Sequence, residues 1–316
     1  MRRPHPRHRM RRAIPTLAVA ALALGGLAGC GDDGTSDAED TASDTASATA
    51  SDTASAPASE ATDGAEAAGE LLVTPFYVGE TPHGPRLFRE LHAGVAATDV
   101  VGFLMDGPED PDYATLVPAG SLVDGTGLAG AGTDGAYTVE IADASWTERP
   151  AGMSAAEAKL AVQQLVWTLQ TVQTGEDYDP TAISAAPVEF LLDGEQVDYL
   201  GVPSGAEAQK ELNVLALVNV ITGLDEPLSG DSATVGGVAS SFEATVPWQV
   251  LDADGADVTD SFATAEGWLD HLYPWSADLD LSVLEPGEYT FVAATADPSD
   301  GEGPGPTVDT KAFTVE

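Results

Sequence analysis

Residues 154–172, SAAEAKLAVQQLVWTLQTV, carry the clearest helical pattern in this chain of 316 residues. Ser154 and Glu157 have the spacing of a capping box, in which each side chain accepts a hydrogen bond from the other residue's backbone N–H. Apolar residues then recur on one helical face: Ala158, Ala161, Leu165, Leu169 and Val172. Gly175 ends the pattern. We predict an amphipathic helix that begins after Ser154 and is embedded among strands.

Short strand patterns surround this helix. Three of them precede it, over residues 71–78, 86–92 and 138–141. Residues 86–92 alternate polar and apolar side chains, which predicts a half-buried strand. Thr98 and Asp99 precede a short helical pattern over residues 100–105. Asp193-Gly194 between two apolar runs predicts a hairpin. These elements together predict an α+β domain over residues 71–203.

The C-terminal part, residues 213–316, has no comparable helical pattern. It consists of apolar runs separated by turns, over residues 214–221, 234–239, 242–251, 279–283, 289–296 and 310–315. Asp254-Gly255 and Glu285-Pro286-Gly287 supply two of the turns. This spacing predicts an all-β immunoglobulin-like sandwich, without the cysteine pair that often links its sheets.

The N-terminus has the pattern of an export signal. Residues 1–29 hold six arginines and no acidic residue, and the apolar run Leu17–Ala28 is too short to cross a bilayer as a helix. Leu27-Ala28-Gly29-Cys30 resembles a bacterial lipobox, whose cysteine is lipidated and becomes the mature N-terminus. Cys30 is the only cysteine of the chain. We predict a lipoprotein signal peptide over residues 1–29 and lipidation at Cys30, with an ordinary secretory signal as the alternative.

Residues 30–70 are predicted to be a disordered acidic tether. They are rich in Asp, Ser, Thr and Ala, and Asp-Thr-Ala-Ser recurs at 40–43, 44–47 and 52–55. Such a segment cannot bury enough apolar surface to offset the entropy lost on ordering.

The charge of the chain excludes whole classes of partner. The sequence has 52 acidic residues and 12 basic ones, six of which lie in the predicted signal peptide. Nucleic acids and anionic lipid headgroups would repel such a chain. We therefore expect no nucleic-acid partner and expect attachment to the membrane through the N-terminal lipid, on the extracytoplasmic face.

Two family resemblances follow from particular segments. Residues 77–90, 161–168 and 188–194 resemble the GerMN domain of sporulation and spore-germination proteins. Residues 238–248 and 297–303 resemble Gmad2, an immunoglobulin-like domain of spore-germination proteins. The order of lipobox, tether, GerMN and Gmad2 resembles that of actinobacterial envelope lipoproteins. The resemblance implies an extracytoplasmic, non-catalytic protein that self-associates or binds an envelope protein or peptidoglycan.

The candidate chemical groups are few. His83, His92 and His271 lie outside any zinc-binding spacing, and we predict no cofactor and no catalytic residue. Residues 252–257 begin like a calcium loop but lack its glycine and its final glutamate, so we predict a hairpin turn. Asp297, Asp300 and Glu302 could offer carboxylates to Ca²⁺, or form only a turn.

Aromatic residues gather in the C-terminal part. Trp268, Tyr273 and Trp275 fall in a segment that we place between two strands, where they either form a binding surface or pack over the end of the sandwich. Phe242 and Trp248 are separated by an even number of positions, so in one strand both would point to the same face, which we predict to be the core.

We predict a lipid-anchored binding or scaffolding protein of the cell envelope, and not an enzyme. The alternatives are a substrate-binding lipoprotein that delivers a small ligand to a transporter, and a peptidoglycan-associated wall enzyme.

Overall fold

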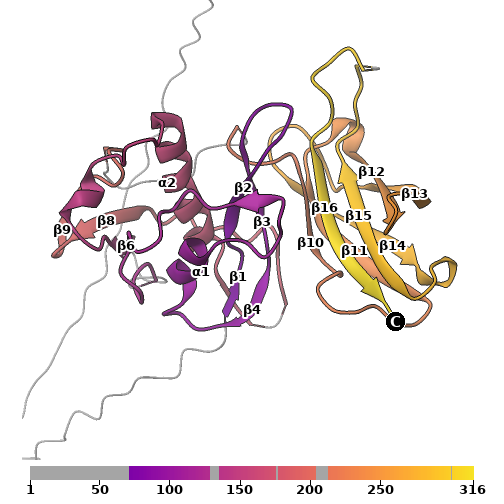
Figure 1. The fold of residues 1–316 in the computed structure, drawn as a ribbon, viewed down its shortest axis with the longest axis horizontal. Coiled ribbons are helices and arrows are strands. Elements are labelled where there is room, and N and C mark those ends of the chain that lie inside the picture. The colour runs from indigo at the N-terminus through magenta and orange to yellow at the C-terminus, as the bar shows by residue number, and fades with distance from the viewer. Residues whose placement is uncertain (1–70, 129–134, 176, 204–212, 300) are drawn as a thin grey trace, which may run out of the picture. The chain divides into compact units, whose positions relative to one another are not determined.

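The computed structural model describes residues 71–128, 135–175, 177–203, 213–299 and 301–316. All of them belong to one compact unit. An α+β module occupies the N-terminal part of this unit, and an all-β immunoglobulin-like sandwich occupies the C-terminal part (Figure 1).

The first module contains three small sheets. Their strands are β1 (Leu71–Val73), β2 (Phe76–Gly79), β3 (Arg86–Arg89), β4 (His92–Val95), β5 (Tyr113–Ala114), β6 (Tyr137–Glu140), β7 (Gln173–Thr174), β8 (Val188–Leu192) and β9 (Glu195–Gln196). The strand orders are β4-β1-β7, β3-β2-β5 and β6-β8-β9. The predicted hairpin at Asp193-Gly194 is confirmed, because it joins β8 to β9.

Helix α2 (Ala155–Gln170) forms as predicted, with the complete capping box between Ser154 and Glu157. Its apolar face is buried, but so are polar side chains on other faces. Gln164 Nε2 donates to the carbonyl oxygen of Phe76 at 2.8 Å, and the N–H of Phe76 donates to Thr168 Oγ1 at 3.0 Å. These polar residues are buried because they satisfy the backbone of β2.

Helix α1 (Val100–Asp106) also forms where predicted, but the side chain of Asp99 does not cap it. A short 3₁₀ helix, η1 (Ala144–Thr147), precedes α2.

We expect Ser154→Ala to lower the free energy of unfolding by about 1 kcal/mol, because the N–H of Glu157 then loses its acceptor at the helix start. Thermal unfolding should show a melting temperature lower by about 2–4 °C. Ser276→Ala, an exposed serine on the second module, is the matched control. An equal response of the two variants would contradict a role for the capping box.

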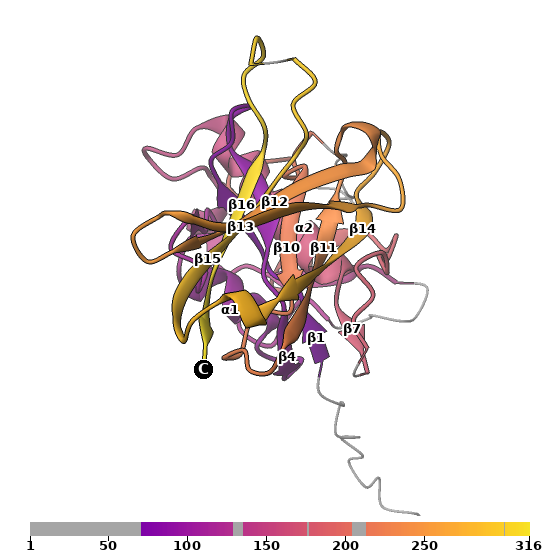
Figure 2. The same cartoon turned by 90° about the vertical axis from the view of Figure 1, so that its right-hand side faces the viewer.

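The second module is a sandwich of two antiparallel sheets (Figure 2). Its strands are β10 (Val218–Thr222), β11 (Ser232–Ala239), β12 (Thr245–Asp252), β13 (Asp257–Thr264), β14 (Tyr273–Asp280), β15 (Gly287–Ala294) and β16 (Val308–Val315), with short 3₁₀ turns η2 (Phe242–Ala244) and η3 (Leu281–Val283). One sheet has the order β10-β11-β14 and the other β13-β12-β15-β16. Trp275 and Phe291 stack between them, with ring centroids 6.4 Å apart.

Three sequence expectations in this module were wrong. Strand β13 was not predicted, because it is an edge strand whose side chains are mostly exposed and polar. Strand β14 occupies residues that we placed in a loop, and its alternating burial was hidden by Pro274 and by the polar side chains between. The run predicted over residues 279–283 is instead the end of β14 followed by η3.

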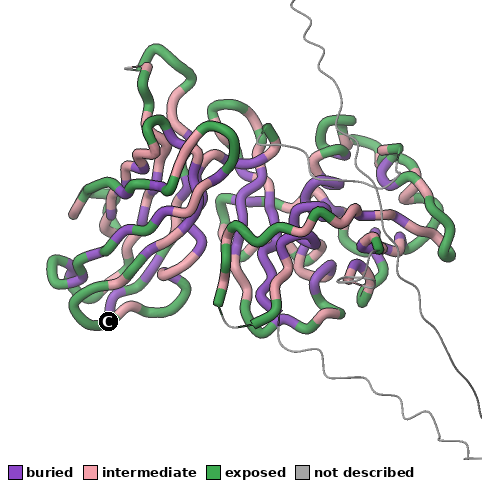
Figure 3. The backbone as a smooth tube through the Cα atoms, turned by 180° about the vertical axis from the view of Figure 1, so that it is seen from behind, coloured by how far each residue is buried: buried purple, intermediate pink, exposed green. Residues whose placement is uncertain are grey.

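Each module has its own apolar core, visible as buried stretches along the strands of both (Figure 3). A third buried cluster joins them. It contains Phe76, Leu87 and Trp167 from the first module and Leu215, Ile221, Val238 and Leu272 from the second part of the chain. The positions of the residues at this junction define the candidate site.

Candidate functional site at the junction of the modules

The strand β3 takes backbone partners from beyond its own module. The N–H of Leu87 donates to Val214 at 2.8 Å, and the N–H of Ala216 donates back to Leu87 at 2.9 Å. Leu87, Phe88 and Arg89 are consequently all buried. The half-buried alternation predicted for residues 86–92 is therefore wrong, since this strand is covered on both faces.

A buried carboxyl group ties the two modules together. Asp309 on β16 is 2% exposed. It accepts a hydrogen bond from the hydroxyl of Tyr113 on β5 and, through Oδ2, one from the N–H of Val220 at 2.6 Å. Burial is the main reason that the pKa of Asp309 is raised, to about 6. Burial and the neighbouring Asp309 also raise the pKa of Tyr113, which keeps its hydroxyl a donor.

The two residues after Asp309 continue this contact. Thr310 Oγ1 donates to Asp112 Oδ2 at 2.6 Å, and Lys311 Nζ lies 2.6 Å from Asp110 Oδ2. The Lys311 ammonium also lies 4.5 Å from the centre of the Tyr113 ring. Three consecutive residues of β16 thus bind Tyr113 of β5 and the loop that precedes it.

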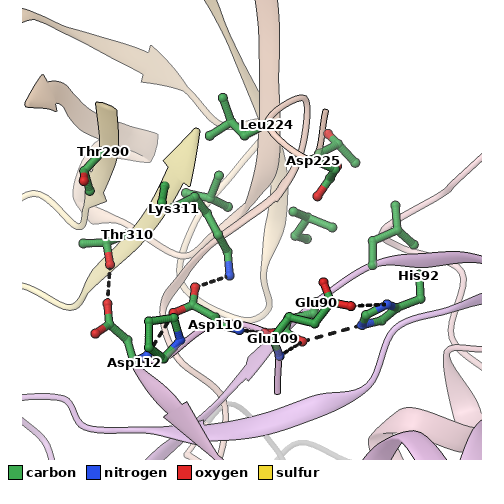
Figure 4. A pocket seen from close by; sticks show the side chains of 16 residues that line it. Glu90, His92, Glu109, Asp110, Asp112, Leu224, Asp225, Thr290, Thr310 and Lys311 are labelled. Carbon is green, nitrogen blue, oxygen red and sulfur yellow. Dashed lines mark hydrogen bonds and ion pairs between the residues drawn. The ribbon is translucent and has the colours of Figure 1, made fainter. Parts of the chain in front are cut away.

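A cavity of about 420 Å³ opens beside this contact, and we call it the junction pocket (Figure 4). Glu90, His92 and Asp110 line it from the first module, and Leu224, Asp225, Thr290 and Lys311 line it from the second. The volume falls in the range of small-ligand sites.

Several charged groups of the junction pocket have partners inside the protein. Glu90 accepts hydrogen bonds from the N–H groups of Asp110 and Glu109, at 2.8 and 3.2 Å, and lies 3.5 Å from His92 Nε2. Burial alone would raise the pKa of Glu90, but these contacts outweigh it and lower the pKa. Lys311 is paired with Asp110. Lys311 therefore links the two modules, whereas Glu90 binds the backbone of its own module, and burial raises the pKa of Asp225.

The structure also places the predicted carboxylates of residues 297–302. Asp297 Oδ1 accepts hydrogen bonds from the N–H and the hydroxyl of Ser299, at 2.9 and 2.5 Å, which is the geometry of a turn. Glu302 is exposed, and Asp300 lies outside the described residues. Across the described ranges, no group of three His, Cys, Asp or Glu side chains has an arrangement that could hold a metal ion.

The three predicted aromatic residues have different environments. Trp275 is buried on β14, where it packs in the sandwich core. Tyr273 is half-buried and donates to Asp270 Oδ1 at 2.8 Å. Trp268 is half-buried and packs edge-to-face against Phe242, with ring centroids 5.2 Å apart.

The parity argument for Phe242 and Trp248 was wrong. Trp248 is buried, but Phe242 is 41% exposed. Phe242 lies in η2, where the backbone is not extended, so the two-residue period of a strand does not apply.

The predicted residues of the N-terminus, including Cys30, lie outside the described part of the chain. Within the part that is described, none of the helices combines the length and apolar character needed to cross a membrane.

Comparison with known proteins relates both modules to one process. Residues 42–198 match the Germane family, described as sporulation and spore germination. Residues 221–302 match Gmad2, the immunoglobulin-like domain of bacterial spore germination. Both modules are similar to spore-germination families. The Gmad2-like match falls on the sandwich and the Germane-like match covers the described α+β elements up to β9. The domain limits 71–203 and 213–316 remain predictions.

Other comparisons add little. The search of curated proteins returned no match. A solved structure, the C-terminal domain of wzt, is 16% identical, with a TM-score of 0.22. The alignment covers 28% of this chain and 63% of that chain.

Proposed function

We propose that this chain is a lipid-anchored protein of the extracytoplasmic face, which binds or scaffolds other envelope components in a sporulation-type or germination-type process and has no catalytic activity. The observation that carries the proposal is the set of buried and charged contacts that hold the two modules together. Asp309 and Lys311 lie on the sandwich, and their contacts with Tyr113 and Asp110 join it to the Germane-like module.

A fastened pair of modules suits a binding body. Inter-domain interfaces that are small and polar usually allow relative motion. Here a shared apolar cluster, backbone hydrogen bonds at Leu87 and a buried carboxyl group act together. Two modules in a fixed relative position can form one binding surface together. The protein then loses no entropy in bringing the modules together when a partner binds.

The sequence supplies the argument for location. The arginine-rich start, the short apolar run and Cys30 fit a lipoprotein signal. Because the mature chain is strongly acidic, membrane attachment requires acyl chains and not a basic surface.

The first test is metabolic labelling of cells with an alkyne fatty acid. We expect the full chain to be labelled and to fractionate with membranes, and Cys30→Ser to abolish both. A labelled Cys30→Ser variant, or wild-type protein that stays unlabelled in the cytosol, would contradict the anchor.

The second test separates binding from catalysis. Full chain is incubated with purified peptidoglycan, and the supernatant is analysed for soluble fragments. Co-sedimentation without release of fragments supports a binding role. Released fragments would favour a wall enzyme, and absence of sedimentation would favour the substrate-binding lipoprotein or a protein partner.

A further inference from the structure

A second cavity, of about 450 Å³, is lined by side chains of a different chemistry. We call it the aromatic groove. His83 lines it from the loop between β2 and β3, and Arg86 lines it from the start of β3. Phe242, Trp268 and Leu269 line it from the Gmad2-like module. Leu217, in the segment that leads into β10, is part of its wall.

The aromatic groove lacks the acidity of the rest of the chain. None of its described lining residues is Asp or Glu, although the chain has 52 acidic residues and only 12 basic ones. Arg86 Nη1 donates to the carbonyl oxygen of Pro85 at 2.8 Å. No carboxylate of a described residue lies within ion-pair distance of Arg86, unlike Lys311, which is paired with Asp110. The guanidinium therefore retains donors for an external carboxylate.

Two apolar side chains at the groove are exposed to solvent. Leu269 is 68% exposed and Phe242 is 41% exposed, and the Trp268 ring packs edge-to-face on Phe242. An exposed cluster of this kind stands out from the scattered apolar residues of an ordinary surface.

The backbone that presents this cluster is in unfavourable conformations. Leu269 has a φ of 98°, and Glu243 and Ala244, which follow Phe242, have φ values of 53° and 58°. Left-handed conformations cost a residue with a Cβ roughly 1–2 kcal/mol each. The side chain of Leu269 is too exposed to offset this through core packing. Such clusters of strained residues occur at binding sites.

We propose that the aromatic groove binds a saccharide that carries an isolated carboxylate. Flat aromatic faces pack against the C–H faces of sugar rings. Ser240 Oγ accepts from the N–H of Leu269 at 3.0 Å, which leaves its own O–H to donate to a sugar oxygen. The fork of the Arg86 guanidinium matches a carboxylate. A dense polyanion is excluded because the acidic protein would repel it, so the negative charge of the ligand must be sparse.

This assignment rests on the proposed binding role and names the chemistry of the partner. A peptide is a poorer fit, since a peptide that extends a sheet edge needs a row of backbone partners, whereas aromatic, apolar and cationic side chains line this groove.

The test uses two disaccharides that differ by one carboxylate, cellobiouronic acid and cellobiose. Titration of the full chain, followed by tryptophan fluorescence and calorimetry, is expected to show at least about tenfold tighter binding of the acid, the equivalent of one charge-assisted hydrogen bond. Arg86→Gln should remove this preference. Arg149→Gln, at an exposed arginine away from the groove, makes the same charge change and should leave the preference intact.

A second set of variants separates binding from folding. Trp268→Ala is expected to weaken binding of both sugars about tenfold, while Phe262→Ala, at a residue that is 65% exposed on β13, has no effect. Leu269→Gly relieves the positive φ and should maintain or raise the melting temperature, yet weaken binding several-fold. Loss of binding without loss of stability is the expected signature.

Three results would overturn the assignment: no binding of cellobiouronic acid, equal effects of Arg86→Gln and Arg149→Gln, or tighter binding of the acidic tripeptide Glu-Ala-Glu than of the acidic sugar. These outcomes are independent of fatty-acid labelling and of peptidoglycan sedimentation, so failure of the groove and failure of the proposed function can be told apart.

Discussion

Asp309→Ala is expected to lower the free energy of unfolding by about 3 kcal/mol at pH 5. The change leaves the Tyr113 hydroxyl and the Val220 N–H buried without their acceptor, and each unsatisfied group costs about 1–3 kcal/mol. At pH 5 the carboxyl group is mostly protonated, because burial raises its pKa to about 6, so its removal relieves no charge penalty. Chemical denaturation of the full chain measures the effect.

The control is Asp257→Ala, which removes an exposed carboxylate at the start of β13. We expect it to change stability by less than about 0.5 kcal/mol. Equal changes in the free energy of unfolding for Asp309→Ala and Asp257→Ala would contradict a stabilising role of the buried carboxyl group between the modules.

The same residue predicts a dependence of stability on pH. Between about pH 4 and 6 the folded chain retains a proton on Asp309 that the unfolded chain has released, since the pKa is raised to about 6 from 3.8. Its contribution to stability is therefore greatest at acid pH and falls by up to about 3 kcal/mol as pH rises through this window.

Asp309→Asn should remove this dependence, because the amide does not titrate. The relevant measurement is the difference between wild type and variant at each pH, in which the effects of the other carboxylates cancel. Lys311, Asp110 and Tyr113 face Asp309 and remain in both proteins. A difference that stays constant from pH 4 to 7 would contradict the raised pKa.

Gly237→Ala is expected to destabilise the protein by about 4 kcal/mol or more. Gly237 is buried in β11, between Val220 on β10 and Trp275 on β14. A Cβ there would lie 1.8 Å from the carbonyl oxygen of Asn219, which is backbone and cannot rotate away. Overpacking a core costs about 1–3 kcal/mol even where side chains can adjust, and here β10 itself would have to move.

Loss of β10 would also weaken the junction, because Val220 donates to Asp309 and Ile221 belongs to the shared cluster. Hydrogen exchange should therefore increase over residues 218–222 and at Leu87. Gly102→Ala is the matched control. A Cβ at Gly102 meets nothing within 4 Å, and alanine favours the helix α1 by up to about 1 kcal/mol. Similar losses of stability in Gly237→Ala and Gly102→Ala would rule out the close approach of Gly237 to the Asn219 carbonyl as the cause.

Sequence patterns predicted those elements that local chemistry specifies. The capping box at Ser154 and Glu157, and the turns at Asp193-Gly194 and Asp254-Gly255, depend on residues close together in the chain. Asp252 Oδ1, for example, accepts from the N–H groups of Asp254 and Ala256 at 2.9 Å each, as a turn requires. The interpretation of residues 252–257 as a hairpin turn is confirmed.

The candidate site was less accessible to sequence reasoning. Trp268 was singled out as an aromatic residue and Leu269 follows it directly, but Arg86 and Phe242 come from other segments, and no spacing connects them to Trp268. Asp309 and Lys311 resemble ordinary surface residues of an edge strand. The one available sign in the sequence was that basic residues are rare in so acidic a chain, which distinguishes Arg86 and Lys311.

The sequence by itself determined the two-part organisation, the order of an α+β module and a sandwich, and the helix α2, because helical periodicity, capping and turn residues act over short distances. Only the tertiary structure decided that β3 is covered on both faces, that β13 is an edge strand, and that Asp309 is buried. Those features depend on which surfaces meet, and a surface between residues some 200 positions apart leaves no local pattern in either partner.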